Sequence, residues 1–293
     1  PDSPLLNDVQ LCFVLLFCGC LDETRHVTHS IHFHFHMVFV TTLILHGVIL
    51  LCLWPGLKKP THFFSLGYAL SVLCQSVCLL LLYRECFSHY LTLLHALLFI
   101  GYGLRLLFYI VLHSFRVAVN AVEKERTQYA LSVPRAALVM CVCSVVLFCM
   151  VSPLFSAILA TANGDPTNGV TYCIGLFFMT LGLGVESVAD WQKNHYKRPH
   201  PELYCSKGLF AYMRMPNYLG ENLFWIGNLV TTFAFPRCAF LLVCNTVGSF
   251  FSISVMIYAA FDLDAKQLRY SATDPEYIAY RRRTYVFYPL PSS

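Results

Sequence analysis

The sequence predicts an all-α fold, a polytopic membrane helical bundle with seven or eight transmembrane helices. The chain of 293 residues is 57% hydrophobic and 12% charged, and its mean hydropathy is +0.60. A soluble globular chain carries about 25% charged residues. Several apolar runs approach or exceed the roughly 20 residues that cross a hydrocarbon core as a helix. The sequence shows no run of the alternating pattern that is typical of an outer-membrane barrel.

Seven apolar runs are the predicted spans. In chain order they are residues 37–54, 63–83, 91–113, 136–160, 169–189, 219–235 and 239–261. An earlier run at 5–21 is interrupted by Asp8, and its apolar part from Leu11 to Leu21 has 11 residues. This run is either a short first span or the apolar region of a signal sequence. Residues 1–90 carry the weakest functional signal, and we expect them to wall a cavity.

The distribution of Lys and Arg predicts the orientation in the membrane. With eight spans, sixteen of the 20 basic residues fall on one side and three, Arg25, Arg84 and Arg237, on the other. Basic loops stay in the cytosol. Both chain ends and the 190–218 loop are therefore expected in the cytosol, and without the first span only the N-terminus changes side.

Arg105 is the basic residue that lies inside a predicted span, 91–113. A cation at membrane depth is costly, so it marks a functional site unless it only snorkels or pairs to hold helices together. Tyr102 and Tyr109 lie three residues before it and four after it. One helix face therefore carries all three side chains.

A second polar stripe is predicted at the end of the 169–189 span. Glu186, Asp190, Lys193 and Lys197 are spaced at 0, 4, 7 and 11, so they share one helix face. The lysines fit a solvated helix end. Glu186 lies a full turn inside the apolar run, where a carboxylate needs a partner or a water-filled cavity.

The segment Met215-Pro216-Asn217 is typical of a helix start, because Pro lacks an N–H that would be unpaired there. From this start Asn217, Glu221 and Asn228 form a third stripe. The second and third stripes are joined by a loop with Lys207 and Arg214. Together they indicate a cytosolic cleft for a long ligand with an anionic end. The LGLG at 181–184 lacks the context of a dinucleotide fingerprint and indicates close helix packing instead.

Three other features have simpler interpretations. The tail DPEYIAYRRRTYVFYPLP is either a basic membrane anchor or a flap over the charged end of a cofactor. Most of the 14 cysteines are expected to pack as small apolar residues. The histidines between residues 26 and 36 fit a membrane interface, and we expect no metal site there.

These residues resemble the steroid 5α-reductase family, and within it the DUF1295 branch, over roughly residues 91–291. The family pattern is met by Glu186, Ala189-Asp190-Trp191-Gln192-Lys193, Gly208-Leu209-Phe210 and Arg214-Met215-Pro216-Asn217-Tyr218-Leu219-Gly220-Glu221. The ending is similar too, with Glu276-Tyr277, Tyr280-Arg281-Arg282-Arg283 and Pro289. Met215 replaces the usual His of the family.

The resemblance implies a membrane reductase that uses NADPH to reduce a carbon–carbon double bond conjugated to a carbonyl in a lipid. Residues 91–293 would form the domain with the cofactor and substrate cavity. The cofactor-binding residues would be Glu186, Asp190, Lys193, Lys197, Arg214, Asn217, Tyr218, Glu221, Lys266 and Tyr277. Asn217 and Glu221 would hold the nicotinamide amide, and Lys197, Arg214 and Lys266 would neutralise phosphates.

The resemblance also implies that Tyr102 is the proton donor, with Arg105 binding substrate or serving structure. Family members pair this tyrosine with an acid from an earlier helix. The upstream acids here are Asp2, Asp8, Asp22, Glu23 and Glu85. All except Asp8 lie near ends or loops, so the sequence names no acidic partner for Tyr102.

Two other functions compete with the reductase. Membrane methyltransferases of the isoprenylcysteine type share an Arg-x-Pro-x-Tyr hinge and bind S-adenosylmethionine, but they would not require Glu186 and Asp190. A non-catalytic lipid-binding protein is the other alternative. We expect an integral membrane protein of the endoplasmic reticulum with its cofactor site facing the cytosol and no nucleic-acid partner. The sequence does not reveal the lipid or the oligomeric state.

Overall fold

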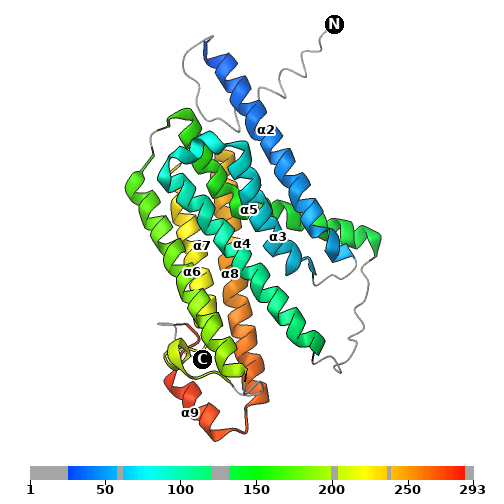
Figure 1. Ribbon diagram of the computed structural model, residues 1–293, viewed down its shortest axis with the longest axis vertical. Helices are drawn as coiled ribbons and strands as arrows, with labels where there is room; N and C mark the ends of the chain where they lie inside the picture. The colour runs from blue at the N-terminus through cyan, green and yellow to red at the C-terminus, as the bar shows by residue number, and fades with distance from the viewer. Residues whose placement is uncertain are drawn as a thin grey trace. The chain divides into compact units, whose positions relative to one another are not determined.

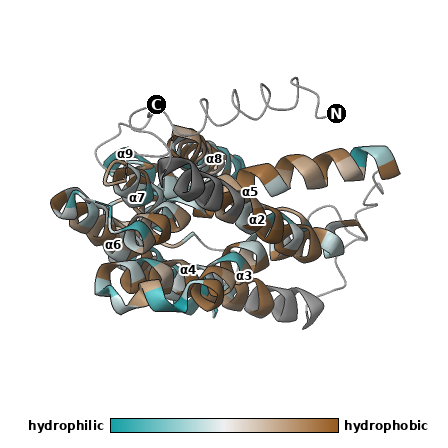
Figure 2. Ribbon diagram, turned by 90° about the horizontal axis from the view of Figure 1, so that it is seen from above, coloured by the Kyte–Doolittle hydropathy of each residue, from teal (hydrophilic) through white to brown (hydrophobic). Residues whose placement is uncertain are grey.

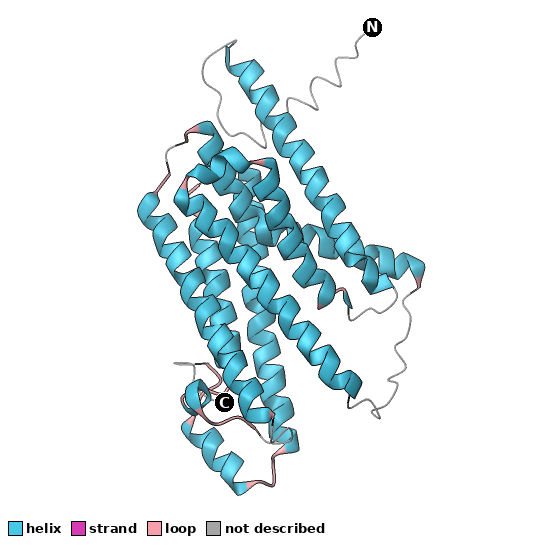
Figure 3. Ribbon diagram, viewed as in Figure 1, coloured by secondary structure: helices cyan, strands magenta, loops and turns pink. Residues whose placement is uncertain are grey.

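The computed structural model describes residues 26–57, 62–119, 132–165, 167–198, 204–235 and 239–287. Within these ranges the chain is helical and forms no strand, apart from an isolated β-bridge between Met213 and Tyr285 (Figure 3). The helices, labelled in Figure 1, are α2 (His26–Leu53), α3 (Leu66–Leu82), α4 (Tyr90–Val119), α5 (Val133–Asn163), α6 (Gly169–Lys197), α7 (Pro216–Thr232), α8 (Ala239–Tyr270) and α9 (Pro275–Arg283). Short 3-10 turns lie at Trp54–Leu57, Arg84–Ser88 and Gly208–Ala211.

The helices confirm the predicted all-α membrane bundle. Among the described residues, the segments long and apolar enough to cross a membrane are Met37–Leu57, Tyr90–Val111, Val133–Asn163, Gly169–Lys197 and Ala239–Tyr270. Leu66–Leu82 is apolar but shorter, and α7 has 17 residues. Each of the seven predicted spans coincides with one of the helices α2 to α8. The run at 5–21 lies outside the described residues, as do the side chains of residues 26–36, where the histidines fall.

Large apolar side chains point outward along these helices. Leu51, Leu81, Phe108 and Phe177 are between 62% and 74% exposed, and the long helices are largely brown, or hydrophobic, in Figure 2. Extended apolar surface of this kind marks contact with a membrane or a partner. Because the described part of the chain contains five candidate spans, this is the surface expected to face lipid.

The chain divides into two compact units. One consists of Pro1–Gly169 with Thr232–Gly248, and the other of Val170–Thr231 with Ser249–Ser293. The first contains α2 to α5 and the beginning of α8, and the second contains α6, α7, the rest of α8 and α9. The division at residue 90 that we expected from the sequence coincides with neither boundary and stays a prediction.

In the first unit, α3 packs against α2, α4 and α5. A glycine sets the closest approach of α3 and α4. A Cβ atom on Gly103 would lie 2.9 Å from Leu73 Cβ and 3.1 Å from the Leu73 backbone. The missing side chain therefore lets the two helices come close enough for tyrosines on each to meet, as described below.

A serine compensates for the proline within α5. Pro153 has no N–H to donate to the carbonyl of Cys149, one turn earlier. The Ser152 hydroxyl lies 2.9 Å from that carbonyl oxygen and 2.5 Å from Asn245 Oδ1 on α8, while Asn245 Nδ2 donates to Ser156 Oγ at 3.0 Å. The freed backbone carbonyl is thus satisfied within the protein, as it must be at membrane depth.

In the second unit, glycines bring α6 and α7 into antiparallel contact. A Cβ on Gly175 would lie 2.8 Å from Gly227 O, and a Cβ on Gly182 would lie 2.5 Å from Gly220 O. The predicted packing role of the LGLG segment is therefore confirmed for Gly182. Gly184 has no atom within 4 Å of its would-be Cβ, so it faces away from α7.

Candidate functional site

The predicted acidic and basic stripe lies on the last turns of α6. Glu186 is buried, with 3% of its surface exposed, whereas Asp190, Lys193 and Lys197 are half-buried. A Cβ on Gly220 would touch the backbone N of Glu186 at 2.5 Å. Glu186 therefore lies where the beginning of α7 meets α6.

Helix α7 begins at Pro216, as the sequence predicts. Asn217, Tyr218 and Glu221 lie in its first two turns and are half-buried. The Oδ1 atom of Asn217 is buried and accepts no hydrogen bond from the described part of the chain. A buried carbonyl oxygen without a donor is costly, so Asn217 presents an acceptor that a ligand N–H could satisfy. Asn228, further along α7 in the same stripe, donates to Ser249 Oγ of α8 at 3.3 Å.

Two residues of the family pattern, Gln192 and Gly208, shape the loop before α7. Gly208 has φ +64°, a backbone conformation that favours glycine. The next residue, Leu209, donates its backbone N–H to Gln192 Oε1 at 2.9 Å. Gln192 and Gly208 thus fasten the loop to α6, which gives both residues a structural role.

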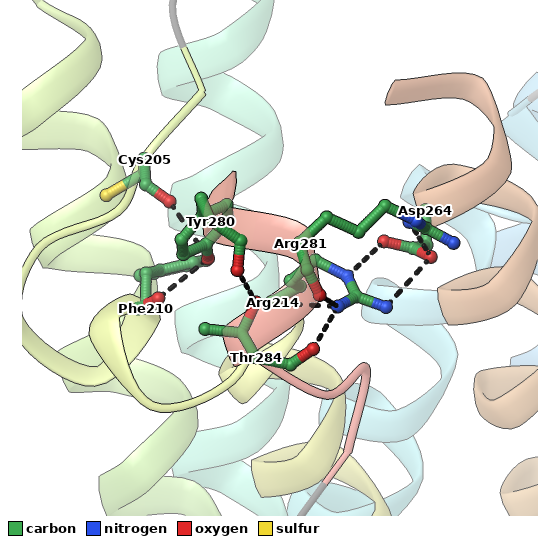
Figure 4. A network of polar contacts seen from close by, with 7 residues as sticks. All are labelled: Cys205, Phe210, Arg214, Asp264, Tyr280, Arg281 and Thr284. Carbon is green, nitrogen blue, oxygen red and sulfur yellow. Dashed lines mark hydrogen bonds and ion pairs between the residues drawn. The ribbon is translucent and has the colours of Figure 1, made fainter. Parts of the chain in front are cut away.

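Arg214 lies at the centre of a buried charge network (Figure 4). Its Nε and Nη2 donate to the two carboxylate oxygens of Asp264 at 2.7 and 3.3 Å. Its Nη1 donates to the carbonyl oxygens of Arg281, at 3.1 Å, and Thr284. Arg281 Nη1 lies 2.5 Å from Asp264 Oδ2. The side chains of Arg214 and Asp264 are only 3% and 4% exposed, so this guanidinium is engaged within the protein, and its predicted phosphate contact stays a prediction.

The tail after α8 is fastened to the loop before α7. Arg214 N donates to Tyr285 O at 2.7 Å, and Met215 N donates to Val286 O at 3.2 Å. Val286 and Phe287 form an apolar cluster with Ala260, against which Met215, Tyr218 and Leu219 pack. Tyr218 therefore contributes at least part of its ring to this packing.

Tyr277 and Tyr280 of α9 are both buried. Tyr280 Oη donates to Phe210 O at 2.6 Å, and burial raises the pKa of its phenol. Burial and the negative charge of Asp264 raise the pKa of Tyr277 as well. Both phenols are therefore neutral at physiological pH, and Tyr280 holds α9 in place through its bond to Phe210 O.

Lys266 behaves differently from Arg214. Its Nζ lies 2.5 Å from Asp262 Oδ2, one turn earlier on α8, and the two side chains are 49% and 37% exposed. An exposed pair of this kind contributes little stability. The ammonium group can therefore exchange its partner for a phosphate at small cost.

Tyr102 and Arg105 lie on α4 in the first unit. Tyr102 is fully buried, and its hydroxyl lies 2.5 Å from the hydroxyl of Tyr68 on α3. The Arg105 guanidinium carbon lies 5.7 Å from the centre of the Tyr102 ring. The predicted grouping of Tyr102 and Arg105 is thus present, and Tyr68 joins it.

Sequence reasoning missed two residues of these clusters, Tyr68 and Asp264. Tyr68 stands in an apolar run, and its alignment with Tyr102 depends on how α3 and α4 pack. Asp264 lies just beyond the end of the predicted span 239–261, where an acid is unexceptional. Its buried position between Arg214 and Arg281 depends on how the tail packs, which the sequence does not show.

Comparison with known proteins gives one family match and several distant relatives. Residues 58–284 match the family described as "Protein of unknown function (DUF1295)". The chain is 32% identical over 94 residues to 3-oxo-5-alpha-steroid 4-dehydrogenase 2 of Macaca fascicularis, which is 31% of this chain and 34% of that protein. It is 30% identical over 94 residues to the Homo sapiens protein of the same name, with the same coverage, and 33% identical over 73 residues to that of Rattus norvegicus, 24% of this chain and 29% of the relative. The matched segments span about a third of the length of these relatives. No solved structure matches the chain.

Proposed function

The chain belongs to the DUF1295 family, and from this membership we propose that it is an NADPH-dependent membrane reductase of an enone lipid. The substrate would be a steroid, a sterol or another lipid with a carbon–carbon double bond conjugated to a carbonyl. The curated relatives carry names of 3-oxo-steroid oxidoreductases, which supports the reaction class. The proposed site is in the endoplasmic reticulum membrane and opens to the cytosol.

The observation that carries the proposal is the buried Oδ1 atom of Asn217, which lacks a hydrogen-bond donor in the described part of the chain. A nicotinamide carboxamide has an NH₂ group with two donors. Asn217 Oδ1 would accept one, and Glu221, one turn further along α7, would accept the other. The residues present therefore fit the polar end of this cofactor.

Charged residues of α6 and α8 would bind the rest of the cofactor. Asp190 would accept hydrogen bonds from its polar body, with Glu186 and Lys193 on the same helix face. Lys197 and Lys266 would neutralise its phosphates. We assign Arg214 a supporting role, since its donors are already bonded to Asp264 and to the carbonyls of Arg281 and Thr284, and Tyr277 would help α9 to close the site.

When bound, the cofactor supplies a hydride to the β-carbon of the enone. The protein must then stabilise negative charge on the carbonyl oxygen and deliver a proton. Tyr102 would do both, as a hydrogen-bond and proton donor. Arg105, whose guanidinium carbon lies 5.7 Å from the centre of the Tyr102 ring, would bind substrate or serve structure.

NADPH binding to the detergent-purified protein tests the proposal. We expect NADPH to raise the melting temperature of the wild type, and Asn217→Ala and Glu221→Gln to weaken its binding by about tenfold or more, the worth of a hydrogen bond to a buried group. Asn245→Ala is the control, because Asn245 is a buried amide whose Oδ1 accepts from Ser152 Oγ at 2.5 Å and whose Nδ2 donates to Ser156 Oγ at 3.0 Å. Unchanged NADPH affinity in both site variants would count against the binding of the nicotinamide by Asn217 and Glu221.

A parallel measurement with S-adenosylmethionine separates the alternatives. Stabilisation by S-adenosylmethionine and not by NADPH would favour a methyltransferase of the isoprenylcysteine type. A folded protein that responds to neither ligand would favour a non-catalytic lipid-binding function.

A further inference from the structure

We propose that Tyr68 is a positioning residue for Tyr102, and that the two hydroxyls form one donor unit for a substrate carbonyl oxygen. This inference rests on the proposed reductase function and extends it. The sequence named no acidic partner for Tyr102, and the structure places the hydroxyl of Tyr68 2.5 Å from that of Tyr102.

The two tyrosines meet across the interface of α3 and α4. Their hydroxyl oxygens lie 2.5 Å apart, and their ring centres lie 6.2 Å apart with the planes at 71°. The close approach at Gly103 and Leu73, with a would-be Cβ only 2.9 Å from its neighbour, holds the helices near enough for this contact. Tyr102 is fully buried, so its hydroxyl is held in a water-poor environment.

The geometry fixes the direction of proton donation once a carbonyl is present. Each phenol has one proton to donate, and its oxygen also accepts. If Tyr102 donates to a substrate carbonyl, its own oxygen is the acceptor in its 2.5 Å hydrogen bond with Tyr68. The chain then runs from Tyr68 to Tyr102 to the substrate, and each hydrogen bond polarises the next.

The same arrangement supports the proton transfer. When hydride is delivered to the β-carbon, the electron pair of the double bond shifts toward the carbonyl oxygen, the O–H bond of Tyr102 breaks, and its proton passes to that oxygen, which gives an enol. The electron pair stays on Tyr102 as a phenolate, which accepts the Tyr68 proton in a charge-assisted hydrogen bond. The Arg105 guanidinium, 5.7 Å from the Tyr102 ring centre, is the nearby cation. The α-carbon then takes a proton from water while the enol O–H proton returns to the Tyr102 phenolate, which completes the saturated bond and restores Tyr102.

Tyr83, in the same unit, is a control that separates a purely structural role of Tyr68 from a positioning role. Tyr83, just after α3, bonds through its hydroxyl to Thr41 Oγ1 of α2 at 2.6 Å. Both Tyr68 and Tyr83 are half-buried, and both link α3 or its end to a neighbouring helix through two hydroxyls. Tyr83→Phe therefore removes a similar interhelical tether without touching Tyr102.

The test combines two measurements on the full chain in detergent. First, the protein is labelled with 3-fluorotyrosine, and Tyr68→Phe and Tyr102→Phe assign the two fluorine resonances. We expect Tyr68→Phe, but not Tyr83→Phe, to shift the Tyr102 resonance in the ligand-free protein. A 3-oxo-4-ene steroid should then shift both resonances in the wild type.

Second, single-turnover reduction of the same steroid is followed with NADPH. We expect Tyr68→Phe to slow turnover by about ten- to a hundredfold, the worth of a hydrogen bond to a charged group, with KM unchanged. Tyr83→Phe should retain the wild-type rate even if it lowers the melting temperature equally. Equal rates for the two variants would overturn the inference. So would a Tyr102 fluorine resonance that does not shift in Tyr68→Phe.

The two measurements separate this inference from the proposed function. If the steroid shifts both resonances but the wild type does not reduce it, the reductase function fails, while the paired hydroxyls stand as a carbonyl site. If the wild type reduces the steroid and Tyr68→Phe does so at the same rate, the function stands and the role of Tyr68 is refuted.

Discussion

Asp264 binds two arginines at once, Arg214 at 2.7 Å and Arg281 at 2.5 Å. The three residues come from the loop before α7, from α8 and from α9, so a single carboxylate joins three separate segments of the second unit. Because two guanidinium groups share one negative charge, the network has a net positive charge even when complete. Its stability therefore depends on Asp264 more than on either arginine.

This dependence gives the first prediction. Asp264→Asn leaves two guanidinium groups without a counter-charge, and breaking a buried ion pair in this way costs about 3–5 kcal/mol. Asp262→Asn is the matched control, because Asp262 lies two residues earlier on α8 and pairs with Lys266 on the exposed surface, where a pair contributes about 0–1 kcal/mol. Thermal unfolding in detergent measures both. Equal losses of stability would show that Asp264 is solvated in solution and that the tail is not held by this network.

At the scale of secondary-structure elements, the pair α6 and α7 carries most of the predicted cofactor residues. The packing of these two helices is set by four glycines, Gly175, Gly182, Gly220 and Gly227. Because glycine has no Cβ, the two backbones can approach more closely than other residues would allow. Small residues commonly serve this purpose in membrane helices, where tight packing replaces the hydrophobic effect. The position of Glu186 relative to Asn217 therefore follows from the glycines.

The second prediction follows from this packing. Gly220→Ala would place a Cβ 2.5 Å from the backbone N of Glu186, and overpacking of this kind costs about 1–3 kcal/mol. We expect Gly220→Ala to lower the melting temperature and also to weaken NADPH binding. Gly184→Ala, on the open side of α6, should leave both unchanged or raise stability slightly, since Ala is a better helix former than Gly. If both variants melt alike, the two helices are not in close contact at Gly220.

Helix existence was predictable from the sequence, because seven long apolar runs leave few alternatives in a bilayer. The helix ends were less predictable. The polar last turns of α6 and α8, which reach Lys197 and Tyr270, continue beyond the predicted apolar runs because helix formation does not stop where hydropathy falls. The start of α7 at Pro216 was predicted correctly, since proline fixes a local backbone preference.

The candidate site was predictable only where its residues share one helix. Spacing alone places Glu186 with Asp190, and Asn217 with Glu221. Contacts between helices depend on packing, so the Tyr68–Tyr102 pair and the Asp264 network could not be read from spacing. For the same reason the sequence suggested a phosphate contact for Arg214 without revealing its bonds to α8 and α9.

At the scale of the whole molecule, the distribution of charge along the chain determines how it is oriented in a membrane. The loop containing Lys207 and Arg214 and the basic helix α9 lie on the same side, because Arg214 of the loop bonds to Arg281 of α9 and to Tyr285 just after it. The short connection between α5 and α6, around Thr167, carries no Lys or Arg. The positive-inside rule therefore assigns Thr167 to the lumen and the turn between α8 and α9 to the cytosol.

Cysteine labelling of sealed microsomes tests this orientation. Thr273→Cys, in the turn before α9, should react with a charged, membrane-impermeant maleimide from the cytosolic face, above the labelling of the parental chain. Thr167→Cys should react only after the membrane is permeabilised, and both positions are exposed in the structure. The opposite pattern would place Asn217 and Glu221 on the lumenal side, away from cytosolic NADPH. It would thereby contradict the proposed function as well as the topology, since the beginning of α7 lies on the same side as the basic loop that precedes it.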